Sequence, residues 1–103
     1  MKIGFIGLGN MAAAMIGGMR GTGAFHAEEI VGSARTQETA DRIRRQYGIA
    51  AGTDNRETAG QADVLILAVK PVFMPEVIAE VRDLVDGERT LVISIAAGRS
   101  IDW

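Results

Sequence analysis

The sequence contains no cysteine, one histidine (His26), and only three phenylalanines, one tyrosine and one tryptophan among 103 residues. Without cysteine there is no disulfide framework, no thiolate metal site and no thiol nucleophile. One imidazole is also too few for a histidine-rich metal site, and His26 lies in a predicted loop, so we give it no catalytic role. These absences favour a cytoplasmic protein that acts on a small molecule.

Long hydrophobic runs are also missing. No apolar stretch reaches the roughly 18 to 20 residues that a membrane span requires, and no charged segment followed by an apolar one and a cleavage site begins the chain. We therefore expect neither a membrane partner nor export. The formal net charge of −2 gives no basic surface for nucleic acid. A chain of this length is expected to form one domain.

Short apolar segments alternate with longer segments of helical periodicity. The patterns at 2–6, 63–69 and 90–96 predict strands buried on both faces of a parallel sheet, and 29–34 and 48–52 predict two further strands. Helices are predicted at 11–20, 36–48 and 75–87, the last two with a glycine at or just past the end. Residues 21–23 are expected to form a loop, and 55–62 a short helix or turn.

This order of elements defines the expected fold. Parallel neighbouring strands need crossover connections, and these are right-handed in nearly all proteins. The economical arrangement is an α/β, Rossmann-like, doubly wound parallel sheet of strand order 3-2-1-4-5 in three layers. We assign residues 1–99 to this domain.

A glycine-rich segment connects the first strand to the first helix. Gly7-Leu8-Gly9-Asn10-Met11-Ala12 matches the G-x-G-x-x-G/A pattern of dinucleotide-binding turns, and it stands between a strand and a helix as that pattern requires. Gly7 would allow the tight turn, Gly9 the approach of a pyrophosphate, and Ala12 close helix packing. Free amide groups and the helix dipole would face the anion. The alternative is that the glycines only permit a tight turn.

The end of the second strand indicates which nucleotide binds. An acidic residue there holds the ribose 2′-hydroxyl of NAD, whereas an arginine accommodates the 2′-phosphate of NADP. This chain has no carboxylate at that point and instead has Ser33, Arg35 and Thr36, two hydroxyls and a guanidinium. We therefore predict NADP(H). The missing acid also argues against S-adenosylmethionine, while the alternative is a solvated arginine beside a helix-capping hydroxyl.

Two later motifs end the fourth and fifth strands. "AVKP" (68–71) and "SIAAG" (94–98) fall at the carboxyl edge of the sheet, where ligands of doubly wound folds bind. Taken singly they could be a solvated lysine, a helix-starting proline and a turn of small residues. Together with "IGFIGLGNM", "SART" and "DN" at 54–55, they make essentially the whole chain resemble the amino-terminal domain of pyrroline-5-carboxylate reductase.

This resemblance implies a function and a set of roles. Members of the family transfer a hydride from NADPH to the cyclic imine 1-pyrroline-5-carboxylate and so form L-proline. By resemblance, the pyrophosphate would be held by Ile6, Gly7, Leu8, Gly9, Asn10 and Met11, and the adenosine phosphate by Ser33, Arg35 and Thr36. Asn55 would face the adenosine side. The ribose and nicotinamide would be lined by Ala68, Val69, Lys70, Pro71, Ile95, Ala96 and Ala97.

One departure from the family concerns the end of the sequence. Family members continue into a helical domain that forms a homo-oligomer and completes the substrate pocket, whereas this sequence stops after Ser100-Ile101-Asp102-Trp103, which looks like the start of a helix. We expect a truncation or an isolated domain, which leaves the proton donor unassigned.

Three other functions stay open at this stage. The chain could belong to another NADP-dependent dehydrogenase or imine reductase, to a nucleotide-sensing module without catalysis, or to a structural domain that binds no nucleotide.

Overall fold

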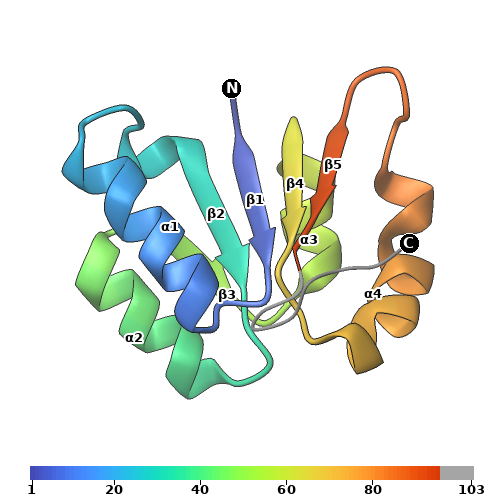
Figure 1. Ribbon diagram of the computed structural model, residues 1–103, viewed down its shortest axis with the longest axis horizontal. Coiled ribbons are helices and arrows are strands. Elements are labelled where there is room, and N and C mark those ends of the chain that lie inside the picture. The colour runs from blue at the N-terminus through green and yellow to red at the C-terminus, as the bar shows by residue number, and fades with distance from the viewer. Residues whose placement is uncertain (96–103) are drawn as a thin grey trace.

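A five-stranded parallel sheet forms the centre of the computed structural model, which describes residues 1–95. Its strands lie in the order β3-β2-β1-β4-β5, which confirms the predicted topology. All strand arrows in Figure 1 point to the same edge, so the carboxyl ends of the strands lie together. The strands are β1 (Ile3–Ile6), β2 (Ile30–Ser33), β3 (Ala50–Gly52), β4 (Val64–Leu67) and β5 (Leu91–Ser94).

Helices cover both faces of the sheet and give the expected three layers (Figure 1). One layer contains α1 (Asn10–Gly21) and α2 (Gln37–Tyr47). The other contains α3 (Asn55–Gln61) and α4 (Met74–Val81). Short 3-10 helices precede β2, precede α4 and follow α4: η1 (Ala27–Glu29), η2 (Pro71–Phe73) and η3 (Arg82–Leu84).

Alternation along β1 supplies both hydrophobic cores. Successive side chains of a strand point to opposite faces. Ile3 and Phe5 therefore pack with α1 and α2, whereas Ile6 packs with α3 and α4. Phe5 is fully buried, and burying one such side chain stabilises the fold by about 1.5–3 kcal/mol. The central strands thus form the rigid base on which the loops at their carboxyl ends are placed.

The predicted helix at 75–87 is shorter than expected. It is regular only to Val81, tightens into η3 and ends at Leu84, so Gly87 does not end a helix. The reason is a turn at Asp86: its carboxylate accepts from the Glu88 amide at 3.0 Å, and its carbonyl accepts from the Thr90 amide at 2.7 Å. Such local side-chain bonds compete with helical ones. The prediction was correct for α2, where Gly48 is the C-cap, while Gly21, expected in a loop, belongs to α1.

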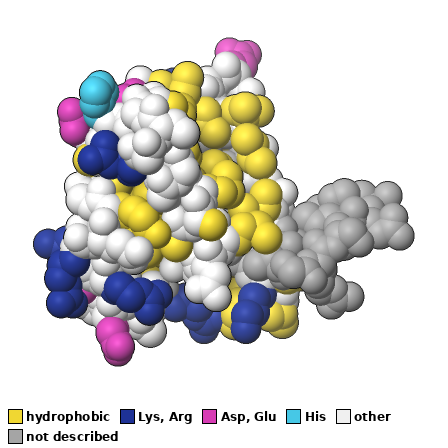
Figure 2. All heavy atoms as spheres, turned by 60° about the vertical axis from the view of Figure 1, so that its left-hand side comes forward, with side chains coloured by type: hydrophobic (Ala, Val, Ile, Leu, Met, Phe, Trp, Pro, Cys, Tyr) yellow, Lys and Arg dark blue, Asp and Glu magenta, His cyan; other side chains and the backbone are white. Residues whose placement is uncertain are grey.

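The prediction that the strand at 90–96 is buried on both faces was wrong. β1 and β2 are buried throughout, but β5 is exposed along its length, and Leu91 retains 60% of its accessible surface. β5 forms one edge of the sheet, and Leu91 and Ile93 share a face with Val64 and Ile66 of β4. Figure 2 shows apolar side chains gathered in a broad band on the side of the molecule that it presents. An apolar sequence pattern cannot distinguish an edge strand of this kind from a central one.

Candidate functional site

The turn between β1 and α1 has a conformation that requires glycine at its first position. Gly7 has φ +96°, a left-handed value that side chains strongly disfavour. A Cβ atom on Gly7 would also lie 2.7 Å from the Ala68 carbonyl oxygen. The Gly7 amide donates to the Ser33 carbonyl at 2.9 Å. The turn is therefore held against the ends of both neighbouring strands, as the glycine pattern predicted.

No contact or backbone angle among the described residues requires a glycine at position 9. Its backbone is extended, with φ −82°, and a Cβ atom placed on it would meet no atom within 4 Å. Unlike Gly7, it has room for a Cβ atom and a backbone conformation that other residues adopt. The missing side chain instead leaves open space in front of the first turn of α1. This space is what a group approaching the backbone would need.

The N-terminus of α1 has no side-chain cap among the described residues. The first amide groups of a helix lack partners within the helix. α2 and α3 satisfy theirs with the side chains of Thr36 and Asp54, but Gly9 offers no side-chain cap. The first turn of α1 also holds no acidic residue. The positive end of the helix dipole is thus left without a compensating group from its own helix.

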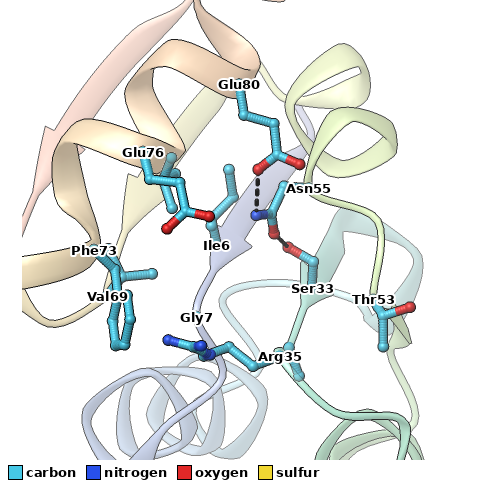
Figure 3. A pocket seen from close by; sticks show the side chains of 12 residues that line it. Ile6, Gly7, Ser33, Arg35, Thr53, Asn55, Val69, Phe73, Glu76 and Glu80 are labelled. Atoms are coloured by element: carbon cyan, nitrogen blue, oxygen red, sulfur yellow. Dashed lines mark hydrogen bonds between the residues drawn. The ribbon is translucent and has the colours of Figure 1, made fainter.

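A pocket of about 250 Å³ lies beside this turn, between the ends of β1, β2 and β4 and the side of α4 (Figure 3). Half of its lining comes from residues that the sequence predicted: Ile6, Gly7, Ser33, Arg35, Asn55 and Val69. The other half was missed: Ala34, Thr53, Phe73, Glu76, Val77 and Glu80. Glu76 and Glu80 are four positions apart on α4, and this spacing could have indicated that they share one helix face.

Other predicted residues lie outside the pocket lining. Leu8 is buried at 2% exposure and packs where a side chain on Gly32 would otherwise be, so its side chain belongs to the core. Thr36 caps α2 by accepting from the Thr39 amide at 3.3 Å, which is the capping role left open as an alternative. The other predicted residues are exposed: Gly9, Asn10 and Met11 at the start of α1, and Lys70 and Pro71 after β4.

The remaining predicted residues flank the ends of β4 and β5. Ala68 donates its amide to Ile6 at 2.8 Å, and Ile95 donates its amide to Leu67 at 2.9 Å. These bonds continue the strand pairing and place Ala68 and Ile95 at the same edge of the sheet. Ala96 and Ala97 lie outside the described residues. His26 is exposed at the start of η1, before β2, whereas the pocket lies at the end of β2.

A chain of hydrogen bonds crosses one wall of the pocket (Figure 3). The Ser33 hydroxyl donates to Asn55 Oδ1 at 2.6 Å, and Asn55 Nδ2 donates to Glu80 Oε1 at 2.8 Å. The Glu80 carboxylate oxygen can only accept, so the Asn55 NH2 group must face Glu80. The Asn55 oxygen therefore faces the Ser33 hydroxyl. Three elements, β2, α3 and α4, are joined in this way by polar groups that line the pocket.

A salt bridge next to Asn55 holds α3 against α4 and η3. The Arg56 guanidinium donates to both carboxylate oxygens of Asp83, at 2.8 and 3.0 Å, and to the Glu80 carbonyl at 2.8 Å. This hydrogen bonding lowers the pKa of Asp83 below its usual value and raises that of Arg56. The bidentate contact thus fixes the position of α3, from which Asn55 reaches the pocket.

Arg35 lies across the lower part of the pocket in Figure 3. Its guanidinium carbon is 3.7 Å from the centroid of the Phe73 ring, which is the geometry of a cation–π contact. Within residues 1–95 its guanidinium has no hydrogen bond or salt bridge. The cation therefore stands on one side of the pocket, and the two carboxylates of α4 stand on another.

The described residues contain no cluster of three potential metal ligands. Residues 1–95 also contain no helix with the length and apolar character needed to span a bilayer.

These features define the class of the protein. A doubly wound parallel sheet, a glycine turn leading to an uncapped helix and a pocket at the carboxyl edge are those of a Rossmann dinucleotide-binding domain. A family model described as "NADP oxidoreductase coenzyme F420-dependent" matches residues 2–98. The chain belongs to this family.

Known proteins support a closer relationship. The chain is 37% identical over 101 residues to a protein of Escherichia coli (strain K12) named pyrroline-5-carboxylate reductase, covering 98% of this chain and 37% of that protein. A solved pyrroline-5-carboxylate reductase from Coxiella burnetii is 36% identical with a TM-score of 0.87, covering 94% of this chain and 36% of the other. The resemblance inferred from the motifs is therefore confirmed.

A third protein shows the same fold at lower identity. It is a Plasmodium falciparum pyrroline carboxylate reductase with NADP bound, 24% identical with a TM-score of 0.77, covering 93% of this chain and 33% of that one. The chain thus spans about a third of the length of these relatives.

Proposed function

We propose that this chain binds NADP(H) at the carboxyl edge of its sheet and that the whole protein reduces 1-pyrroline-5-carboxylate to L-proline. The observation that carries the proposal is the free N-terminus of α1 beside a pocket lined by Ser33, Arg35 and Asn55. The names of the relatives in Escherichia coli and Coxiella burnetii give the substrate.

The described residues fit the cofactor at its phosphate groups. The pyrophosphate would lie in the open space before Gly9, against the amide groups of Asn10 and Met11. Arg35 has no anionic partner within residues 1–95 and would take the 2′-phosphate. Asn55 and Glu80 offer acceptors to the hydroxyl and amino groups of the adenosine. The cationic donor in the pocket would thus face the phosphate, and the acceptors would face the hydroxyl and amino groups.

The nicotinamide half would lie along the loops that follow β4 and β5. Ala68, Val69, Lys70 and Pro71 form the first loop, and Pro71 begins η2, which directs the chain away from the sheet. Ile95 follows β5 directly, and by resemblance Ala96 and Ala97 would also face the nicotinamide half. Small side chains here would leave room for a flat ring, and Lys70 would bring positive charge close to an anionic group.

The bound cofactor supplies the hydride, and the protein residues supply position. The turn at Gly7 and the ends of β1, β2 and β4 form one rigid edge. This edge would hold the cofactor in a fixed orientation and leave one side of it open to the substrate. No residue of this chain is assigned as proton donor.

A binding titration and an activity assay separate the candidate functions. NADPH fluorescence should change on titration with this chain, whereas a structural domain would give no change. Oxidation of NADPH with pyrroline-5-carboxylate by the whole protein supports the reductase. Binding without such oxidation favours a nucleotide-sensing module, and oxidation with a different substrate favours another NADP-dependent dehydrogenase or imine reductase.

We also propose that the protein acts in the cytoplasm as a homo-oligomer. The resemblance to the reductase family supports the homo-oligomer, since its members assemble through a helical domain that follows the cofactor domain. Light scattering on the purified whole protein measures its mass in solution, and a monomer would contradict the proposed assembly.

A further inference from the structure

We propose that Phe73 is a positioning residue for Arg35 and that it thereby sets the preference for a 2′-phosphorylated nucleotide. The proposal rests on the proposed function, since it takes Arg35 as the group that contacts the 2′-phosphate. Its basis is the contact between the Arg35 guanidinium and the Phe73 ring, which brings a residue from the end of β2 against one from η2.

The contact leaves the donors of Arg35 available. A guanidinium is planar, and its five N–H groups point outward in that plane. The guanidinium carbon lies over the Phe73 ring, 3.7 Å from its centroid, and a phenyl ring has no nitrogen or oxygen atom that would accept a hydrogen bond from these groups. The edge of the cation stays free for a bidentate contact with phosphate. The ring therefore restricts where the cation lies without competing for its hydrogen bonds.

Phe73 is itself held in place. Its amide donates to the Lys70 carbonyl at 2.9 Å, which closes the turn of η2 after Pro71. Its side chain is half-buried and packs against the hydrophobic core between the sheet and α4. Arg35, by contrast, is an exposed residue whose guanidinium has no hydrogen bond within residues 1–95. Ordering so long a side chain on a fixed ring lowers the entropy lost when phosphate binds.

The other charged groups of the pocket do not take this role. Glu76 and Glu80 line the same pocket, yet neither lies within salt-bridge distance of Arg35 among the described residues, and Glu80 is engaged with Asn55. An acidic partner would neutralise the cation and repel phosphate, whereas an aromatic ring holds the cation and leaves its charge unchanged. The structure therefore assigns the specificity for phosphate to a pair of residues rather than to Arg35 alone.

The test compares adenosine 2′,5′-bisphosphate with adenosine 5′-monophosphate by calorimetry, using the 103-residue chain. Phe73→Leu keeps an apolar side chain but removes the ring. It should lower the affinity for the bisphosphate by about two- to fivefold and change the affinity for the monophosphate by less than about twofold. Phe73→Tyr keeps the ring and should retain the ratio of the two affinities. Circular dichroism shows that each variant is folded, and Phe73→Met replaces Phe73→Leu if that variant is not.

Arg35→Ala provides the second arm. If Phe73 acts through Arg35, adding Phe73→Leu to Arg35→Ala should leave the ratio of the two affinities unchanged. Equal weakening of both nucleotides by Phe73→Leu would overturn the proposal, because the ring would then contact the base or support the fold. An unchanged ratio in Phe73→Leu would also overturn it. If Arg35→Ala itself leaves the ratio unchanged, the proposed phosphate contact fails as well, so the two failures are distinguishable.

Discussion

Ser33 and Asn55, 22 positions apart, are joined by a hydrogen bond of 2.6 Å in which the Ser33 hydroxyl donates to the Asn55 amide oxygen. Ser33 retains 1% of its accessible surface, so this bond is shielded from water on the Ser33 side. It ties the end of β2 to the start of α3. The amide in turn donates to Glu80 of α4, so the bond orders one wall of the pocket.

Loss of this hydrogen bond should reduce stability measurably. Ser33→Ala leaves the Asn55 oxygen without its donor, and we expect a loss of about 1 kcal/mol in the free energy of unfolding, measured with urea. Ser94→Ala is the matched control, since within residues 1–95 that exposed hydroxyl makes only a 3.9 Å contact, with the Met74 sulfur, and its removal should change little. Equal effects of the two variants would contradict the role given to the Ser33 bond.

The two glycines of the turn should respond differently to substitution. Gly7→Ala adds a Cβ atom at φ +96° and 2.7 Å from a carbonyl oxygen, so the free energy of unfolding should fall by about 2 kcal/mol or more. A Cβ atom at Gly9 meets no protein atom within 4 Å, so Gly9→Val should cost less than about 1 kcal/mol. A thermal melt of both variants measures the difference, and similar melting temperatures would contradict it.

Gly9→Val should nevertheless abolish tight cofactor binding. The branched side chain fills the space before the N-terminus of α1, where the pyrophosphate would approach the backbone. We expect NADPH affinity to collapse while the circular dichroism spectrum stays that of the unmodified chain. Calorimetric titration measures the affinity, and unchanged binding would remove the pyrophosphate site from this turn.

Arg35 should distinguish the two nicotinamide cofactors. A hydrogen bond to a charged group contributes about 1.5–3 kcal/mol. Arg35→Ala should therefore lower the affinity for NADPH roughly ten- to hundredfold and change the affinity for NADH little. Arg45→Ala, on the exposed side of α2, is the matched control and should affect neither. Fluorescence titration of the unmodified chain and both variants with each cofactor gives the six affinities. Equal losses for NADPH and NADH in Arg35→Ala would show that this side chain does not contact the phosphate.

This chain should bind the cofactor without catalysing its oxidation by the substrate. The glycine turn, Ser33, Arg35 and the loop after β4 all lie within it, so we expect it to bind NADPH. Positioning of a substrate accounts for about 7–11 kcal/mol of a barrier, and the chain spans only 37% of its Escherichia coli relative. We therefore expect negligible NADPH oxidation with pyrroline-5-carboxylate. Substantial turnover by the 103 residues would contradict a site completed by other segments.

The Arg56–Asp83 salt bridge should contribute a stability that depends on pH. Hydrogen bonding lowers the pKa of Asp83 in the folded chain. The folded state thus binds a proton less readily than the unfolded state, so the contribution is fully present above the usual carboxyl pKa of about 4 and is lost as pH falls through the lower pKa of the folded chain. Asp83→Asn should lower the urea midpoint slightly at about pH 7 and by less at about pH 3. An equal difference at both pH values would contradict this origin.

The sequence by itself determined the order of the elements and the turn at Gly7. Buried strands such as 2–6 and 63–69 are continuous apolar runs, and helices such as 36–48 have a polar face, so local periodicity identifies both. The glycine pattern between a strand and a helix predicted the tight turn. The left-handed φ and the close Ala68 carbonyl in the structure confirm that Gly7 is required there. Right-handed crossovers then leave few possible strand orders, and the observed one was predicted.

The tertiary structure decided which side chains meet. Phe73, Glu76 and Glu80 enter the pocket because α4 packs beside α3, and nothing in their local sequence separates them from other surface residues of a helix. The exposure of β5 is equally non-local, since it depends on its place at the edge of the sheet rather than on its composition. Periodicity reports how a segment folds against a core, whereas contacts between distant segments arise only when all the segments are packed together.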